Sequence, residues 1–213
     1  MTDQATLATT RKALHAVAEL VMAGPQHRDN GSIRLTVTPG GFATVAAPEL
    51  RVEDGELVGD GRVPLNGTTC RELAAAFQVD PGAPKDLYKE GSGAGLDDRL
   101  EVDSGAARHL AECLAIGQAA LTGFAPASEP VLWPEHFDLG ITVDEVNYGV
   151  SLGDGYLNEP YAYAGPWKAR SGEFWNAPFG AVRPIRELAD ATAVQGFFQE
   201  ARERAGSDPV QKP

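Results

Sequence analysis

A pair of alternating runs on either side of Asp144 and Glu145 constrains the fold more than any other feature of this sequence. Apolar side chains occupy every second position in residues 136–143 and again in residues 146–152. A period of two is typical of a strand that buries one face. With residues 144–145 as the turn, both apolar faces fall on the same side, which is the register that burial favours. Neither Asp nor Glu favours positive φ, so a longer loop is the alternative.

Aromatic side chains gather around this predicted hairpin. Residues 131–182 contain all three tryptophans, four of the five tyrosines and three of the eight phenylalanines. A third strand is predicted at residues 161–163, and residues 166–178 read as irregular. Aromatic side chains with polar tips build pockets for sugars, heterocycles or quaternary amines, and they equally build the core of a small sheet. Tyr148 falls on the apolar face, which predicts a core position.

Side chains in the irregular segments are the better binding candidates, because loops carry function more often than cores do. We expect a small, partly apolar ligand in a cleft between the aromatic strands and the loops around residues 167–179. The sequence identifies no cofactor. The predicted ligand-binding residues are Trp133, Glu145, Asn147, Tyr161, Tyr163, Trp167, Trp175 and Asn176.

The candidate catalytic pair is His136 and Asp138, which lie two positions apart on the first predicted strand. Such side chains share a face, with roughly 6–7 Å between their Cα atoms. This spacing suits an imidazole with an orienting carboxylate, or two ligands of one metal. Two ligands do not make a zinc site and no third is identified, so no metal ligand is predicted. The alternative is that both residues belong to the polar outer face of a half-buried sheet.

The composition narrows the class of protein. The chain has 213 residues, of which 43% are hydrophobic, which suits one large domain or two small ones. Its net charge of −12 and pI of about 4.7 make binding to nucleic acid or to an anionic membrane unexpected. Neither a signal peptide nor a membrane span is evident, so we expect a soluble cytoplasmic protein. Cys70 and Cys113 lack metal-type spacing and are predicted to be reduced core thiols. The Ala-, Gly- and Asp-rich usage is typical of a high-GC bacterial genome.

The N-terminal half reads as helices alternating with short strands. Residues 4–23 predict an amphipathic helix that Gly24-Pro25 ends, with His15 off the apolar stripe and solvated. Strands follow at 32–38 and 42–47, with a hairpin around Asp54-Gly55. Thr69 to Glu72 has capping-box spacing and opens a helix. Leu100 and Val102 suggest a strand, and Ser104 is expected to cap a long helix.

Residues 125–130 form the best candidate linker. They predict a first half at 1–124 and an aromatic-rich half at 131–205, followed by a tail at 206–213. One continuous domain is the alternative. A second capping-box pattern, Thr192 to Gln195, predicts the start of a C-terminal helix.

The element order over residues 4–124 resembles the sterol-carrier-like fold, including the version fused to bacterial mycothiol-dependent isomerases. That resemblance implies an apolar cavity for a lipid or another hydrophobic ligand, and no chemistry. The C-terminal half resembles a set of bacterial proteins that share WPEHFD-type and FWNAPFG-type segments, from which no activity carries over. The residues that carry the N-terminal likeness are Ile33–Val37, Leu50–Leu65, Leu73–Phe77 and Leu100–Leu121.

Together these patterns predict an α+β protein in which antiparallel sheets pack against three longer helices. The favoured function is binding of a small, partly apolar ligand in the aromatic-lined cleft. One alternative is a metal- or His/Asp-assisted enzyme that works at His136 and Asp138. Another is a structural or assembly protein, with the aromatic side chains buried at a homodimer interface.

Overall fold

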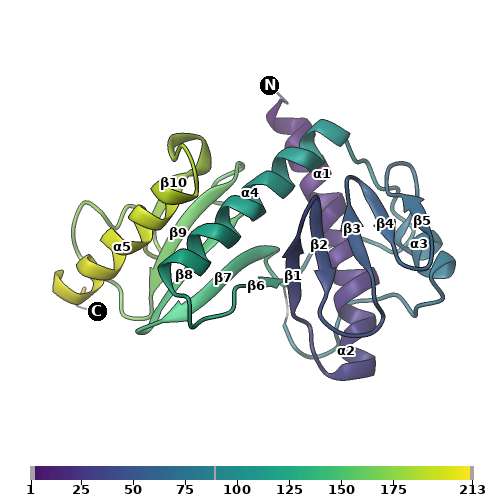
Figure 1. Cartoon of the computed structure of the whole chain (residues 1–213), viewed down its shortest axis with the longest axis horizontal. Coiled ribbons are helices and arrows are strands. Elements are labelled where there is room, and N and C mark those ends of the chain that lie inside the picture. The colour runs from purple at the N-terminus through teal and green to yellow at the C-terminus, as the bar shows by residue number, and fades with distance from the viewer. Residues whose placement is uncertain (1–2, 89, 212–213) are drawn as a thin grey trace. The chain divides into compact units, whose positions relative to one another are not determined.

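The computed structural model describes residues 3–88 and 90–211. Helices combine with strands that pair antiparallel, so the predicted α+β class is confirmed (Figure 1). The chain divides into two compact units. The first comprises Met1–Glu112 with Val131–Asp138, and the second comprises Cys113–Pro130 with Leu139–Pro213. The sequence predicts a division at residues 125–130. The chain passes between the two units at Pro130–Val131, and also inside a helix, Ser104–Phe124, and after Asp138.

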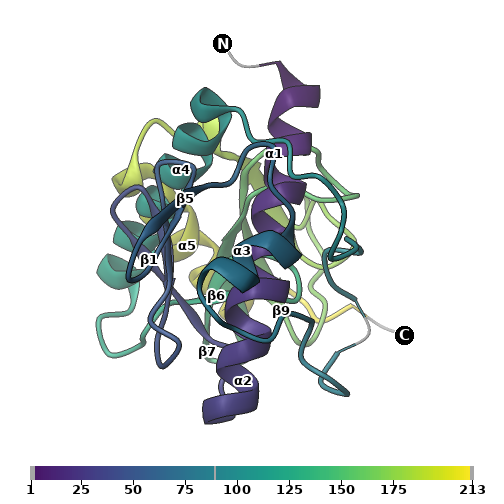
Figure 2. The same ribbon diagram turned by 90° about the vertical axis from the view of Figure 1, so that its right-hand side faces the viewer.

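In the first unit, a long helix lies on a sheet with strand order β6-β1-β2-β3-β4-β5. Figure 2 shows α3 crossing this helix, and the contact is with its middle segment, η1. The elements are α1 (Gln4–Val17), the π-helix η1 (Ala18–Ala23), α2 (Gly24–Asn30), β1 (Leu35–Thr38), β2 (Gly41–Thr44), β3 (Arg51–Glu53), β4 (Glu56–Val58), β5 (Arg62–Pro64), α3 (Cys70–Ala76), the first part of α4 (Ser104–Phe124) and β6 (Val131–Trp133).

The first helix does not end at Gly24-Pro25, so that prediction is wrong. In η1 the hydrogen bonds run from residue i+5 to residue i, as from the Gly24 N–H to Glu19 O. The next donor in this series would be Pro25, which has no N–H, so the Leu20 carbonyl loses its helical partner. The N–H of Gly82 donates to Leu20 O instead, at 2.8 Å. Because a tertiary contact replaces the missing bond, the helix continues to Asn30.

Other local predictions for this unit are mixed. Thr69 and Glu72 form the predicted capping box, and β3 and β4 form the predicted hairpin around Asp54 and Gly55. Leu100 and Val102, in contrast, lie outside any strand. The Asp103 carboxylate accepts from the Ala106 N–H at 2.8 Å, and Ser104 is already the first helical residue. The residue that caps this helix is therefore Asp103, and the prediction that Ser104 caps it is wrong.

In the second unit, one face of a four-stranded sheet is covered by helix. The strand order is β10-β9-β8-β7, and the buried ring of Tyr148 contacts Phe124 of α4 and Phe198 of α5. The predicted core position of Tyr148 is confirmed, since none of its surface is exposed. The elements are the rest of α4, β7 (Asp138–Val143), β8 (Val146–Ser151), β9 (Tyr161–Pro166), β10 (Ala181–Pro184), the 3₁₀ turn η2 (Ile185–Glu187) and α5 (Ala191–Ser207).

The turn between β7 and β8 has two residues, so the alternative of a longer loop is wrong. Asp144 and Glu145 both adopt positive φ, at 52° and 61°. This conformation costs roughly 1–2 kcal/mol for each residue with a side chain. Two long-range contacts accompany this turn: Asp144 pairs with Arg202 of α5 at 2.6 Å, and Glu145 O accepts from the Trp167 N–H at 2.9 Å.

Two further boundaries differ from prediction. β7 begins at Asp138, and His136 lies in the preceding turn, where Phe137 has a φ of 52°. His136 and Asp138 therefore do not share a strand face. The Phe137 ring reaches the core through the turn and not through strand alternation. Helix α5 begins after Asp190, whose carboxylate accepts from the Ala193 N–H, and not at Thr192.

Candidate functional site

The predicted site residues fall into both units. Trp133, His136 and Asp138 belong to the first unit, and the other predicted residues belong to the second.

The second unit carries an aromatic face, which we define by Tyr156, Tyr161, Tyr163, Trp167 and Phe179. Tyr163 pairs with Gly149 across β9 and β8, and Ala164 pairs with Tyr148. Side chains of paired residues share a face, and Tyr148 faces the helices. The aromatic face is therefore the side of the sheet opposite α5.

Trp167 is the most exposed large side chain of this face, at 64%. Its ring is nevertheless held, because the indole N–H donates to Asn147 Oδ1 at 3.3 Å. Thr142 donates to the same oxygen at 2.8 Å. These two bonds fix the orientation of the Asn147 amide. Its N–H donors have no protein partner within the described residues.

A second exposed group lies around Tyr156. The Tyr156 ring is 46% exposed and meets Phe179, which is 42% exposed, edge-on at 5.2 Å. It also meets Tyr161 at 6.5 Å. Tyr161 is buried, and its hydroxyl donates to Asp154 at 2.5 Å. Tyr163 is half-buried beside it, at 6.4 Å.

Two predicted ligand-binding residues hold the fold together. The Asn176 side chain bridges the backbone N–H and carbonyl of Val182, at 2.9 and 3.2 Å. The Trp175 indole N–H donates to Asp208 at 2.9 Å, which ties the 167–179 segment to the end of α5. The polar groups of Trp175 and Asn176 are thereby bonded within the protein, whereas in Asn147 only the amide oxygen is bonded among the described residues.

In the first unit, His136 lies in the exposed turn before β7. Its side chain is 58% exposed and lies 3.9 Å from Glu135 and 4.0 Å from Glu90. Asp138 is half-buried at the start of β7. Trp133 ends β6 and is 37% exposed.

His15 was predicted to be solvated, and this is wrong. Its ring stacks on Phe137 with centroids 5.3 Å apart, and its Nε2–H donates to Pro134 O at 2.7 Å. Burial lowers the pKa of His15, and the nearby Glu19 carboxylate opposes that shift. The neutral imidazole thus serves as a packing group with a single directed hydrogen bond.

Sequence reasoning also missed Glu19. Its side chain is buried in η1 and accepts from both the backbone N–H and the hydroxyl of Ser92, at 2.8 and 2.6 Å. Burial and the Glu19 carboxylate raise the pKa of the neighbouring Tyr88. A single acidic residue inside the apolar run AELVMA was the available signal. The arrangement fastens the irregular 80–99 segment onto the helix.

Both cysteines are buried, as predicted, and no disulfide joins them. Burial raises the pKa of the Cys70 thiol to about 12, so it is protonated and unreactive at neutral pH. Within residues 3–88 and 90–211, no group of three His, Cys, Asp or Glu side chains could hold a metal ion. Over the same residues, no helix is long and apolar enough to cross a membrane.

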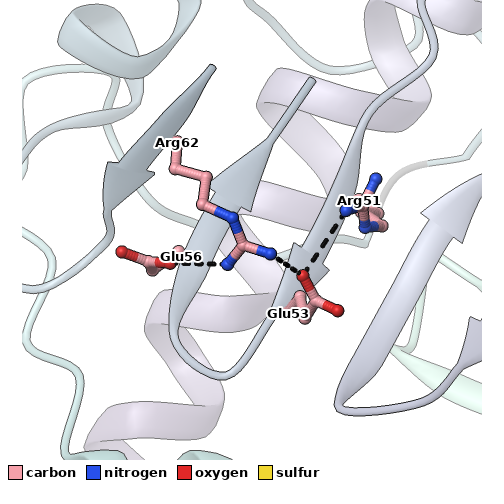
Figure 3. Close-up of polar contacts among 4 residues, drawn as sticks. All are labelled: Arg51, Glu53, Glu56 and Arg62. Carbon is pink, nitrogen blue, oxygen red and sulfur yellow. Dashed lines mark hydrogen bonds and ion pairs between the residues drawn. The ribbon is translucent and has the colours of Figure 1, made fainter. Parts of the chain in front are cut away.

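The first unit contains a pocket of about 380 Å³ between the β2–β3 connection and the turn after β4. Ala43 and Val45 contribute apolar surface to it, and Glu49, Arg51 and Asp60 contribute charge. Charged residues of both signs continue along β3–β5, where Arg62 forms ion pairs with Glu53 and Glu56 (Figure 3). Charge on the short strand β5 also discourages edge-to-edge association.

No protein-family model matches this chain, and neither a curated protein nor a solved structure is significantly similar to it. These comparisons neither support nor contradict the resemblance to the sterol-carrier-like fold.

Proposed function

We propose that the second unit binds a small, partly apolar ligand, such as a sugar or a heterocycle, against the aromatic face. The observation that carries the proposal is the Trp167 ring, which is 64% exposed and yet anchored at both its backbone and its indole nitrogen. An exposed apolar ring that is fixed in advance loses little conformational entropy when a ligand stacks on it.

Hydrogen-bonding and charged groups lie beside the Trp167 ring. The Asn147 amide presents N–H donors because its oxygen is occupied by Trp167 and Thr142. Glu145 and Lys168 lie at the same edge and form an exposed ion pair at 3.7 Å. A sugar or heterocycle has a flat, weakly polar face and a hydrogen-bonding rim, which matches this combination of an aromatic plane and neighbouring donors and acceptors.

The same side chains would suit a homodimer interface, because large exposed aromatic residues are enriched where proteins associate. The polar fixing of Trp167 favours the small ligand. Self-association depends on protein concentration, so varying that concentration separates the two functions.

The test is a titration followed through the three tryptophan indole N–H signals in ¹H–¹⁵N NMR spectra. Methyl β-D-glucoside, adenosine and choline serve as probes. We expect at least one probe to shift the Trp167 signal saturably and to leave the Trp175 signal unchanged, because that N–H is held by Asp208. W167A should abolish the binding, and W133A, which removes an exposed tryptophan of the first unit, should preserve it.

The proposal fails if no probe shifts the Trp167 signal, or if W167A binds as the wild type does. A Trp167 signal that moves with protein concentration alone, together with a dimer mass that W167A reduces, would assign the face to self-association instead.

A further inference from the structure

The pocket of the first unit has a rigid wall. Gln26 is fully buried, and its amide makes four hydrogen bonds to backbone groups. Two of these, from the Val45 and Ala46 N–H groups at 2.7 and 2.9 Å, fix the β2–β3 connection that borders the pocket. The Thr44 hydroxyl closes the same connection by donating to Pro48 O at 2.7 Å. A site whose shape exists before binding loses less entropy when a ligand enters.

The guanidinium of Arg51 is available to a ligand. Arg62 makes two close ion pairs, with Glu53 and Glu56, whereas Arg51 reaches Glu53 by one longer contact of 3.5 Å (Figure 3). Glu53 is therefore neutralised mainly by Arg62. Arg51 lines the pocket and keeps most of its donors for another carboxylate.

Negative charge lines the same pocket. Glu49 and Asp60 are exposed, and neither has an ion-pair partner within the described residues. Glu49 and Arg51 are two positions apart, so along an extended chain their side chains leave from the same side, with Cα atoms roughly 6–7 Å apart. A carboxylate and a guanidinium are thus presented together above the apolar surface of Ala43 and Val45.

We infer that this pocket binds a small zwitterion with an aliphatic part, of which an α-amino acid is the simplest example. Arg51 receives the ligand's carboxylate, Glu49 and Asp60 receive its ammonium group, and Ala43 and Val45 contact its aliphatic side chain. A purely anionic ligand would meet two carboxylates, and a purely cationic one would meet the guanidinium, so each would lose part of the attraction. The volume of about 380 Å³ lies within the range of about 300–1,000 Å³ that is usual for small-molecule sites.

The test compares three ligands of one shape by NMR and calorimetry. L-Leucine carries both charges, 4-methylpentanoate carries only the carboxylate, and isoamylamine carries only the ammonium group. We expect L-leucine to shift the backbone amide signals of Val45 and Gly59, and to bind at least about tenfold more tightly than either analogue, which is about 1.4 kcal/mol.

The variants are Arg51→Gln and its matched control Arg71→Gln. Both remove one exposed guanidinium of the first unit that pairs with a carboxylate, but only Arg51 lines the pocket. R51Q should weaken L-leucine binding at least about tenfold, and R71Q should change it by less than about threefold. Equal binding of the three ligands, equal effects of the two variants, or no shift at Val45 and Gly59 would overturn the inference.

The ligand comparison uses the wild-type protein, so it decides the question even if R51Q does not fold. The readout also lies in the first unit. A failure here is therefore distinguishable from a failure of the aromatic-face proposal, which is read at Trp167.

Discussion

The backbone N–H of Gly82 donates to the carbonyl oxygen of Leu20, a group that Pro25 leaves without a partner in the helix. The approach is so close that a Cβ atom at Gly24 would lie 1.7 Å from Gly82 O. The hydrogen bond that replaces the one lost at Pro25 therefore depends on the absence of a side chain at Gly24, which lets Gly82 approach the helix.

The first prediction concerns Gly24. Gly24→Ala should lower the free energy of unfolding by about 1–3 kcal/mol or more, because the added methyl group forces Gly82 away and breaks its bond to Leu20. Urea unfolding followed by circular dichroism measures the change. Gly61→Ala is the control in the same unit, since a Cβ there meets nothing within 4 Å. Equal stability of G24A and the wild type would contradict the close contact.

The second prediction concerns the β7–β8 turn. Glu145→Gly should raise the free energy of unfolding by about 1 kcal/mol, because glycine adopts the observed φ of 61° without strain. The ion pair of Glu145 with Lys168 is exposed and contributes little. Glu145→Ala removes the same carboxylate but keeps a Cβ atom, so it should not stabilise the protein. If both variants behave alike in urea unfolding, backbone strain is not the cause.

The third prediction concerns the hydroxyl of Tyr148. It is buried without a hydrogen-bond partner within the described residues, and burial raises its pKa to about 12. Tyr148→Phe should therefore preserve or raise stability at pH 7, by up to about 1 kcal/mol. The unfolded chain ionises at the ordinary tyrosine pKa of 10.0 while the folded chain does not, so this group makes stability fall as pH rises from about 10 to about 12.

Unfolding experiments from pH 8 to pH 11 check this prediction. Y148F should lose less stability than the wild type above pH 10. The control is Tyr156→Phe, which alters an exposed hydroxyl. A steeper alkaline decline in Y148F than in the wild type would contradict the assignment.

The fourth prediction concerns His15. Burial lowers its pKa from the ordinary histidine value of 6.5, so the unfolded chain binds a proton more readily than the folded chain does. The neutral side chain therefore contributes stability above about pH 6.5, and this contribution is lost as pH falls below that value. His15→Gln should flatten the decline between pH 7 and pH 5, measured by urea unfolding. His27→Gln serves as the control, and an unchanged slope in H15Q would show that His15 does not titrate in this window.

Much of the local structure followed from patterns within a few residues. The alternation around Asp144 and Glu145 predicts β7 and β8, and the same alternation separates the core residue Tyr148 from the exposed Asn147. The capping box at Thr69 and the hairpin at Asp54-Gly55 were also readable, because their geometry depends on adjacent residues.

Two departures from local preference have a common cause, which is contact with a residue that is distant in the sequence. Pro25 should end a helix, but Gly82 supplies the missing hydrogen bond. Asp144 and Glu145 should avoid positive φ, but Arg202 and Trp167 hold the turn. No window of sequence contains both members of these pairs.

The candidate sites were likewise predictable only in part from local sequence. The concentration of aromatic residues and the choice of Trp167 and Asn147 came from the sequence, because composition and strand period are local properties. The role of Gln26 could not be read there, since a glutamine in a helix ordinarily faces solvent. Only the tertiary structure surrounds its amide with four backbone partners and thereby shapes the pocket that Arg51 lines. The sequence thus identified candidate side chains, because residue type and strand period are local. Only the tertiary structure decided which of their polar groups are already bonded within the protein, because those partners are distant in the sequence.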